Sequence, residues 1–351
     1  VKLQKLKKMF ALMLLLSLGW ARGDSEDVDA EIEAFIARAT ARGHRAYDEL
    51  LNGSESHSRD EFVDRFVARR LREEAAAILQ AKGLASVEDE APHRKQEERI
   101  DECRAAAAAA LGEREEEEFA VLSSSLKSFE RVRCSNYLVD YEVEGCAPPP
   151  TCGRGVVPSV ATTQEAALVR RATDLATADL YHQGGSTSVS VSGQKSSNHR
   201  LFSVEVWRLI VDLKARAQRE TERLFDGVRL FEAGSLLTRL DAAPRLGDRQ
   251  LNVSHVYWNP HVDKANRAAY DYSALLYLAD FGVDFSGGQL EFFDDATRRT
   301  LLEPTAGTLV AFTSGLENLH RVRKLHHGHR FVLALWFTCD PALAYVVSDI
   351  Q

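Results

Sequence analysis

The sequence lacks an excess of positive charge, a long apolar run and an internal repeat. Lysine and arginine number 44 against 52 aspartates and glutamates, so the formal net charge is −8. A chain of this sign has no global attraction to nucleic acid or to an anionic membrane surface, and we expect neither as a partner. At 351 residues the chain can bury a large core, and we expect one main domain with an extension.

The apolar run near the N-terminus, Met9–Leu18, is too short to cross a bilayer as a helix, which takes about 20 residues. It follows four lysines and precedes a short stretch with small residues, a pattern typical of a secretory signal. Residues 1–23 are therefore predicted to be a signal peptide or, if uncleaved, a signal anchor. The expected location is the secretory pathway, in the endoplasmic reticulum lumen or on a membrane facing that lumen.

Cysteine is scarce, at five residues, and the count is odd. Cys134, Cys146 and Cys152 fall within 19 residues of one another. Beside a secretory signal, this cluster favours a disulfide over a metal site, with unpaired buried thiols as the alternative. Because the count is odd, at least one cysteine lacks an intramolecular partner. Cys339, on an expected core strand, is the predicted free thiol.

Two regions precede the expected main domain. Residues 24–130 are rich in Ala, Glu and Arg with apolar residues at helical spacing, so we expect a helical region of unknown role. Sustained heptads are missing, which disfavours a coiled-coil partner surface. Residues 131–158 are predicted to be a Cys- and Pro-rich linker, since Pro148–Pro150 cannot lie inside a helix. Asn52 begins an N-glycosylation pattern.

Residues 159–345 are expected to form the main domain. Two amphipathic helices are predicted at 163–181 and 204–225, separated by a Gly- and Ser-rich loop that is either a lid or a flexible connection. From residue 251 onward, short β-branched and aromatic runs alternate with turn residues. The predicted strands are 251–258, 272–278, 289–293, 308–313 and 330–338. The fold class is therefore α+β: a jelly-roll (double-stranded β-helix) core with supporting helices, preceded by a helical region.

Three residues in this domain have the chemistry of a metal site. His261 and Asp263 are separated by one residue, so on an extended strand they would project from the same face. His320 follows the predicted strand 308–313, where a jelly roll can bring it opposite the first pair. Two imidazoles and one carboxylate on one face of a metal suit non-haem Fe(II). The alternative is a chance pair and a histidine on a surface loop.

Arg330 opens the predicted strand 330–338, where its guanidinium needs an anionic partner because an unpaired buried charge is costly. The far carboxylate of a bound dicarboxylate would pair with it through two hydrogen bonds. An internal salt bridge is the alternative. His326, His327 and His329 lie between His320 and Arg330, and we interpret them as an exposed loop rather than a second metal site.

Four segments, HVDK, YDYSALLYLADFGVDFSGGQLEFF, EPTAGTLVAFTSGLENLHRV and GHRFVLALWFTCDP, carry a family resemblance. Over roughly residues 200–342 the chain resembles the prolyl 4-hydroxylase-like Fe(II)/2-oxoglutarate dioxygenases, and its strands also resemble the collagen prolyl 3-hydroxylases. In the collagen-type 4-hydroxylases a lysine usually stands where this chain has Arg330. Only arginine offers a planar fork to a carboxylate, so the difference weakens any expectation of collagen-type 4-hydroxylation.

The resemblance implies a role for six residues. His261, Asp263 and His320 would be the iron ligands, and Arg330 would pair with the C5 carboxylate of 2-oxoglutarate. Tyr277 would share that carboxylate through its hydroxyl. Trp336 would wall the iron pocket. For Tyr277 and Trp336 the alternative is ordinary strand packing.

The implied cofactors are Fe(II), 2-oxoglutarate as cosubstrate, O₂ and ascorbate. The implied reaction is hydroxylation of a C–H bond of a protein side chain, with proline the leading candidate, while 2-oxoglutarate is decarboxylated to succinate and CO₂. A protein or peptide substrate would be the partner. Two alternatives stay open: a catalytically silent jelly-roll binding module, and a dioxygenase that acts on a small molecule. The sequence names neither the substrate nor the oligomeric state.

Overall fold

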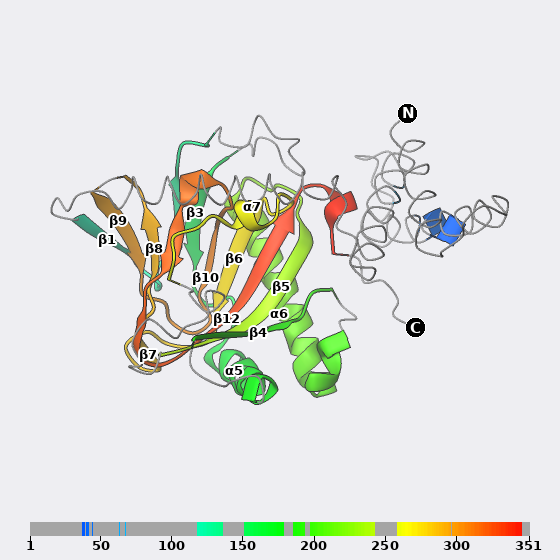
Figure 1. Cartoon of the computed structure of the whole chain (residues 1–351), viewed down its shortest axis with the longest axis horizontal. Coiled ribbons are helices and arrows are strands. Elements are labelled where there is room, and N and C mark those ends of the chain that lie inside the picture. The colour runs from blue at the N-terminus through cyan, green and yellow to red at the C-terminus, as the bar shows by residue number, and fades with distance from the viewer. Residues whose placement is uncertain are drawn as a thin grey trace, which may run out of the picture. The chain divides into compact units, whose positions relative to one another are not determined.

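A computed structural model of the chain describes residues 118–135, 151–178, 185–193, 197–242, 258–295 and 297–345, together with residues 37, 38, 40, 41, 44, 63 and 67 (Figure 1). The chain divides into two compact units, Val1–Glu98 with Pro341–Leu343 and Arg99–Asp340 with Ala344–Gln351. In the first unit Val63 and Val67 are helical and buried, one helical turn apart, as the predicted helical region requires. The predicted signal segment and Asn52 lie outside the described residues.

Two helices of the second unit begin where their capping residues lie. Helix α5 (Thr163–Thr177) opens with a capping box in which Thr162 and Glu165 bond each other's backbone amides. Helix α6 (Val204–Leu224) is capped by the Ser203 hydroxyl. Both predicted helices are confirmed. None of the described helices is both long enough and apolar enough to cross a membrane.

The strands form two sheets (Figure 1). The eight-stranded major sheet has the order β2-β3-β10-β6-β12-β5-β4, with β7 paired to β12, and the four-stranded minor sheet has the order β1-β9-β8-β11. The strands are β1 (Glu118–Leu122), β2 (Ser128–Arg131), β3 (Gly153–Val157), β4 (Gly185–Ser190), β5 (Phe231–Asp241), β6 (Tyr272–Tyr277), β7 (Phe285–Gly287), β8 (Leu290–Phe293), β9 (Arg298–Leu302), β10 (Leu309–Thr313), β11 (His320–Val322) and β12 (Leu325–Thr338).

Alternation along β12 explains how the layers pack. Phe331, Leu333, Leu335 and Phe337 lie in the core cluster that includes the apolar faces of α5 and α6. Their neighbours Val332 and Ala334 lie in a second cluster that includes apolar residues of the minor sheet. Successive side chains of a strand point to opposite faces, so one face of the major sheet is covered by helices and the other by the minor sheet. The predicted jelly-roll core with supporting helices is confirmed.

Several predicted element boundaries were wrong. Strands β1 and β2 lie within or overlap the region expected to be helical, and β3 lies inside the segment expected to be a linker, so the sheets begin before residue 159. The glycines of β3 serve close strand packing: a Cβ on Gly153 would lie 2.5 Å from the backbone oxygen of Glu130 on β2. The Gly- and Ser-rich segment expected to be a loop contains β4, a polar edge strand paired with β5.

The disulfide prediction was right for one pair and wrong for one residue. Cys134 and Cys152 form a disulfide that closes a separation of 18 residues. Cys339, predicted to be free, is also disulfide-bonded, and its partner lies outside the described residues. The reason is its position: β12 ends at Thr338, so Cys339 lies half-buried where the chain leaves the sheet instead of inside a core strand.

Candidate iron and cosubstrate site

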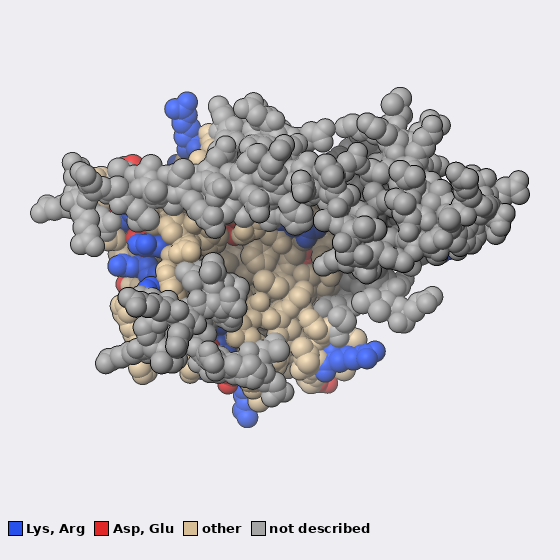
Figure 2. Space-filling model, in the orientation of Figure 1, with Lys and Arg blue, Asp and Glu red and all other residues tan. Residues whose placement is uncertain are grey.

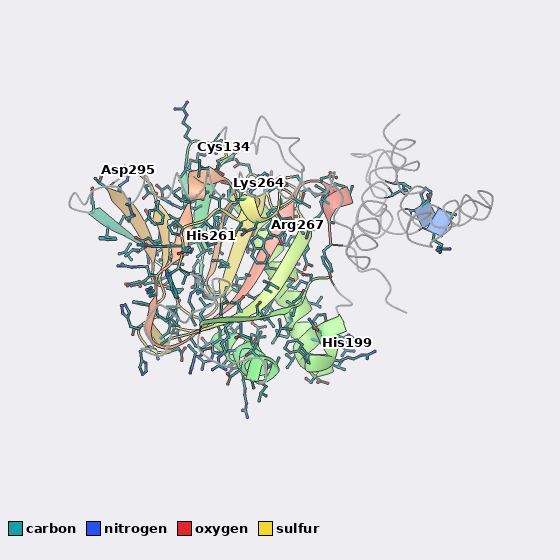
Figure 3. All side chains as sticks on the ribbon, in the orientation of Figure 1. Cys134, His199, His261, Lys264, Arg267 and Asp295 are labelled. Atoms are coloured by element: carbon teal, nitrogen blue, oxygen red, sulfur yellow. A yellow bond between two sulfur atoms is a disulfide. The ribbon has the colours of Figure 1, made fainter. Side chains whose placement is uncertain are left out.

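A two-residue β-bridge brings the two histidines of the site together. The His261 amide donates to the His320 carbonyl at 2.8 Å, and the His320 amide donates to the His261 carbonyl at 3.0 Å. The two imidazole ring centroids are 4.5 Å apart. The prediction that His261 and Asp263 lie on one extended strand was wrong. Val262 is extended, but Asp263 begins the short helix α7 (Asp263–Asn266). Figure 3 shows His261 beside α7, on the same part of the molecule as Lys264 and Arg267.

The three side chains present one ligand atom each, and these atoms lie within 4.8 Å of one another. The Nδ1–H of His261 donates to the Asn259 carbonyl at 2.9 Å, and that of His320 to the Asn318 carbonyl at 2.8 Å. A carbonyl only accepts, so the proton is on Nδ1 in both rings and the Nε2 lone pair is left for a metal. His320 and Asp263 are buried, whereas His261 is partly exposed.

The electrostatics of the site favour the protonation states that a metal needs. Burial, together with the nearby His261, lowers the pKa of His320 to about 4, so this imidazole is neutral at neutral pH. Burial alone would raise the pKa of Asp263, but the neighbouring His320 and His261 and a hydrogen bond from Ser273 lower it overall. A neutral imidazole and an ionised carboxylate are the forms that bind metal.

A buried asparagine holds the segment that carries His320. Asn318 is 1% exposed, and its side-chain amide donates to the Gly153 carbonyl at 3.2 Å, the Thr313 carbonyl at 3.0 Å and the Thr313 hydroxyl at 2.9 Å. The backbone carbonyl of Asn318 accepts the Nδ1 proton of His320. The contacts of the Asn318 side chain therefore set the orientation of the His320 imidazole ring. Asn318 could not be recognised from the sequence, because its position two residues before His320 does not reveal its burial.

Asp263 is held from two directions. The Ser273 hydroxyl donates to its carboxylate at 2.6 Å and also contacts the Ser314 hydroxyl at 2.7 Å. Beside Asp263 in α7, the buried Lys264 forms an ion pair with the buried Asp271 at 2.6 Å. This pair fixes α7, and thereby Asp263, to the start of β6. These residues too could not be recognised from the sequence.

Arg330 and Tyr277 form a buried pair on the face of the major sheet that looks toward the minor sheet. The Arg330 guanidinium is 3% exposed and donates from Nη2 to the Tyr277 hydroxyl at 2.9 Å. Within the described residues no carboxylate pairs with Arg330, and its Nε has no hydrogen-bond partner. Burial raises the pKa of Tyr277, with Arg330 opposing, so the phenol stays protonated. A guanidinium and a phenol can together bind one carboxylate.

Trp336 lies at the other end of the same face. It is paired in register with Ser273, whose hydroxyl bonds Asp263, so the indole is near the acidic ligand. Its ring stacks on Tyr270, with centroids 5.1 Å apart and planes 11° from parallel. The structure thus places Trp336 near Asp263, with Arg330 six residues away along β12.

The three histidines between His320 and Arg330 are exposed, as expected, but they lie on β12 and not in a loop. Gly328 has a φ of +78° and lies close to the Asp284 carbonyl, which allows the strand to bend there. His329 bonds Asp241 through Nδ1. Across the described residues the only group that could hold a metal is His261, Asp263 and His320.

A facial set of two histidines and one aspartate, on a jelly roll with a buried cation nearby, defines the class of non-haem iron oxygenases that use an acidic cosubstrate. Residues 250–338 match the family described as "2OG-Fe(II) oxygenase superfamily". Over 237 residues, which are 61% of this chain and 71% of the relative, the sequence is 37% identical to the 2-oxoglutarate and iron-dependent oxygenase domain-containing protein 3 of Xenopus tropicalis. The chain therefore belongs to the 2-oxoglutarate- and Fe(II)-dependent oxygenases and is a dioxygenase.

Two further comparisons give weaker similarity. Prolyl 3-hydroxylase 2 of Homo sapiens is 35% identical over 152 residues, which cover 38% of this chain and 20% of that protein. The structure of a viral collagen prolyl hydroxylase from Paramecium Bursaria Chlorella virus-1 aligns with 53% of this chain and 94% of its own, with 14% identity and a TM-score of 0.37.

Proposed function

We propose that this dioxygenase hydroxylates a C–H bond of a protein side chain, with proline as the leading candidate. In the proposed reaction 2-oxoglutarate is decarboxylated to succinate and CO₂, one oxygen atom of O₂ enters the substrate, and the other enters succinate. The observation that carries the cosubstrate assignment is the buried Arg330–Tyr277 pair without a carboxylate partner in the described residues. Proline is the proposed side chain because the sequence is similar to that of prolyl 3-hydroxylase 2.

The residues present fit an iron ion. His261 and His320 would bind it through Nε2 and Asp263 through its carboxylate, a set of residue types that suits non-haem Fe(II). Bound Fe(II) supplies the redox chemistry that activates O₂. Phe312 and Phe292, whose rings lie 4.8 Å and 5.9 Å from that of His320, keep water away from the buried side of the site.

The cosubstrate would be held by the second pair. Arg330 would bind the C5 carboxylate through its fork, and Tyr277 would donate its hydroxyl proton to the same group. Trp336 and Tyr270 would form the aromatic wall beside the ligands. Ascorbate, which would restore iron oxidised in unproductive turnovers, is part of this proposal. We also propose that the protein is located in the secretory pathway. The Cys134–Cys152 disulfide supports this location because disulfides persist in oxidising compartments.

The test has two stages. Anaerobic titration of the full chain with Fe(II) and 2-oxoglutarate should give an absorption band that requires both, and His320→Ala should abolish it. Addition of O₂ and a library of proline-containing peptides should then give succinate together with a peptide heavier by one oxygen. Succinate formed only with small molecules would support the small-molecule alternative. If the absorption band or any turnover were absent, the proposed enzymatic function would be rejected in favour of the catalytically silent binding module.

A further inference from the structure

The Cys134–Cys152 disulfide lies where β2 and β3 meet at one edge of the major sheet. The pairing of the two strands ends with Arg131 opposite Gly153. Just beyond that pair, the Val132 amide donates to the Cys152 carbonyl at 3.0 Å. Strand β2 is the edge strand and has only four residues, and short edge strands open locally at a low cost in free energy. The disulfide is therefore a covalent tie that holds β2 against the start of β3.

Gly153, the residue after Cys152, takes part in holding the proposed iron ligand His320. Its carbonyl accepts a hydrogen bond from the Asn318 side-chain amide at 3.2 Å, and its own amide donates to the Thr313 hydroxyl at 3.4 Å. The backbone carbonyl of Asn318 in turn accepts the Nδ1 proton of His320 at 2.8 Å. The disulfide is thus connected to the imidazole ring through Gly153 and Asn318.

The position of Gly153 depends on β2. The pairing of β3 with β10 stops one residue short of Gly153, so on that side its hydrogen bonds are with the side chains of Thr313 and Asn318. On the other side it packs closely on β2, where a Cβ at Gly153 would lie 2.5 Å from the Glu130 backbone oxygen and 2.6 Å from the Phe129 ring. Both hydrogen bonds of Gly153 are at the long end of the usual range, so a shift of about half an ångström would break them.

A reductant can reach this disulfide from the Cys134 side. Cys134 is half-buried, whereas Cys152 is 3% exposed, and the nearby Arg131 and Arg133 are exposed. Figure 2 shows a basic side chain that projects into solvent at the upper left, near the place where Figure 3 labels Cys134. The disulfide therefore has one end at the surface of the molecule and the other beside the residues that hold His320.

We propose that the Cys134–Cys152 disulfide positions His320, so that reduction of the disulfide weakens iron binding. This role rests on the proposed function, in which His320 is an iron ligand. Reduction by a dithiol breaks the sulfur–sulfur bond, adds two electrons and two protons to give two thiols, and converts the dithiol into its own disulfide. Once the covalent tie is lost, β2 moves away from β3, Gly153 follows, and Asn318 no longer holds His320 in one orientation. The chain therefore binds iron tightly only after this disulfide has formed.

Metal titration of a variant without the disulfide tests the proposal. Cys134→Ala combined with Cys152→Ala should raise the dissociation constant for Mn(II) about fivefold, measured by calorimetry on the full chain under nitrogen at a temperature where the variant is folded. The effect is smaller than for removal of the Asn318 side chain, because the Asn318 amide keeps its bonds to Thr313. In a chain that already carries Asn318→Ala, the two cysteine substitutions should have no further effect, since the connection to His320 is already broken.

Chemical reduction gives a second measurement on the folded, unaltered chain. Reduction with dithiothreitol, followed by its removal under nitrogen, should raise the Mn(II) dissociation constant of the unaltered chain more than that of the cysteine variant. A magnetic resonance signal reports the position of the ring without any metal. In a chain with isotope-labelled histidine, the Nδ1 proton of His320, identified by its absence in His320→Ala, should exchange faster with water when the disulfide is lost.

Val189→Ala is the matched control. Val189 is 4% exposed on β4, the edge strand at the opposite end of the major sheet, so the substitution should lower stability and leave the Mn(II) dissociation constant unchanged. Unchanged Mn(II) binding in the cysteine variant, equal weakening by Val189→Ala, or an undiminished effect in the Asn318→Ala chain would overturn the positioning role alone. A lack of Mn(II) binding by the unaltered chain would overturn the proposed iron site as well.

Discussion

Replacing Asn318 with alanine tests how the proposed iron ligand His320 is positioned. The substitution removes three hydrogen bonds, to the carbonyls of Gly153 and Thr313 and to the Thr313 hydroxyl, inside a fully buried site. The acceptors that remain lose their donor without access to water, which costs on the order of 2 kcal/mol of folding stability. The carbonyl of residue 318 stays in the chain, but nothing then fixes its direction toward the Nδ1–H of His320.

The expected effect on metal binding is separate from that on stability. Loss of a group that orients a metal-bound histidine typically weakens metal binding by about 10- to 100-fold. We expect Asn318→Ala to raise the dissociation constant for Fe(II), or for Mn(II) as a redox-stable substitute, by about tenfold. Calorimetric titration under nitrogen, at a temperature where the variant is folded, measures it. Urea denaturation of the metal-free chain gives the stability loss independently.

Asn198 offers a matched control. Its side-chain amide also donates to a backbone carbonyl, that of Ser190 at 2.9 Å, and Ser190 ends the edge strand β4. Asn198→Ala should lower stability slightly and leave the metal dissociation constant unchanged. If Asn318→Ala binds metal as tightly as the unaltered chain while losing stability, Asn318 is only a structural residue and the reasoning about His320 is refuted.

Two further predictions concern the cosubstrate and pH. Tyr277→Phe removes the hydroxyl that accepts a hydrogen bond from Arg330, so it should raise the KM for 2-oxoglutarate about tenfold and leave kcat at saturation unchanged. Steady-state assays of succinate formation measure both constants. An unchanged KM would contradict the proposed role of Tyr277. Hydrogen bonds from Arg216 and from the Thr162 backbone lower the pKa of Glu165 from 4.5 to about 2, so its contribution to stability is complete above pH 4.5 and is lost as the pH falls toward 2. Because the pair is partly exposed, Glu165→Gln should lower stability at pH 7 by only about 1 kcal/mol and flatten the stability curve between these pH values, as urea denaturation at pH 7 and pH 3 would show.

The elements that could be predicted from the sequence are those whose pattern is local. Strand β12 alternates between two buried faces, and α6 repeats apolar residues at helical spacing and begins after a serine cap, so each can be recognised from its own residues. Strands β1 and β3 cannot, because they form through partners far along the chain. Residue 118 pairs with residue 298, and residue 157 pairs with residue 309. Their own composition is mixed or glycine-rich and favours no strand without those partners.

The residues of the candidate site also fall into those that the sequence reveals and those that only the structure reveals. The ligand atoms belong to residue types that bind iron, so His261, Asp263 and His320 stand out in the sequence. The residues that orient them are ordinary polar side chains, such as Asn318 and Ser273, which become informative only when the fold buries them beside a ligand. The bridge between residues 261 and 320 also depends on tertiary structure, so it could not be recognised from the sequence. The His-x-Asp spacing predicted an extended strand instead.

Arg330 shows what the structure adds to an inference made from sequence. Burial of a cation usually requires a carboxylate, and this chain follows that rule elsewhere: Arg154 pairs with Asp294, Lys214 with Glu232 and Lys264 with Asp271. Arg330 is as buried as these three, yet within the described residues its hydrogen bond goes to a phenol. A fold that supplies an acid to these other buried cations and none to Arg330 leaves the missing charge to a ligand. In the proposed function, a dicarboxylate would supply one carboxylate to Arg330 and keep the other end for iron.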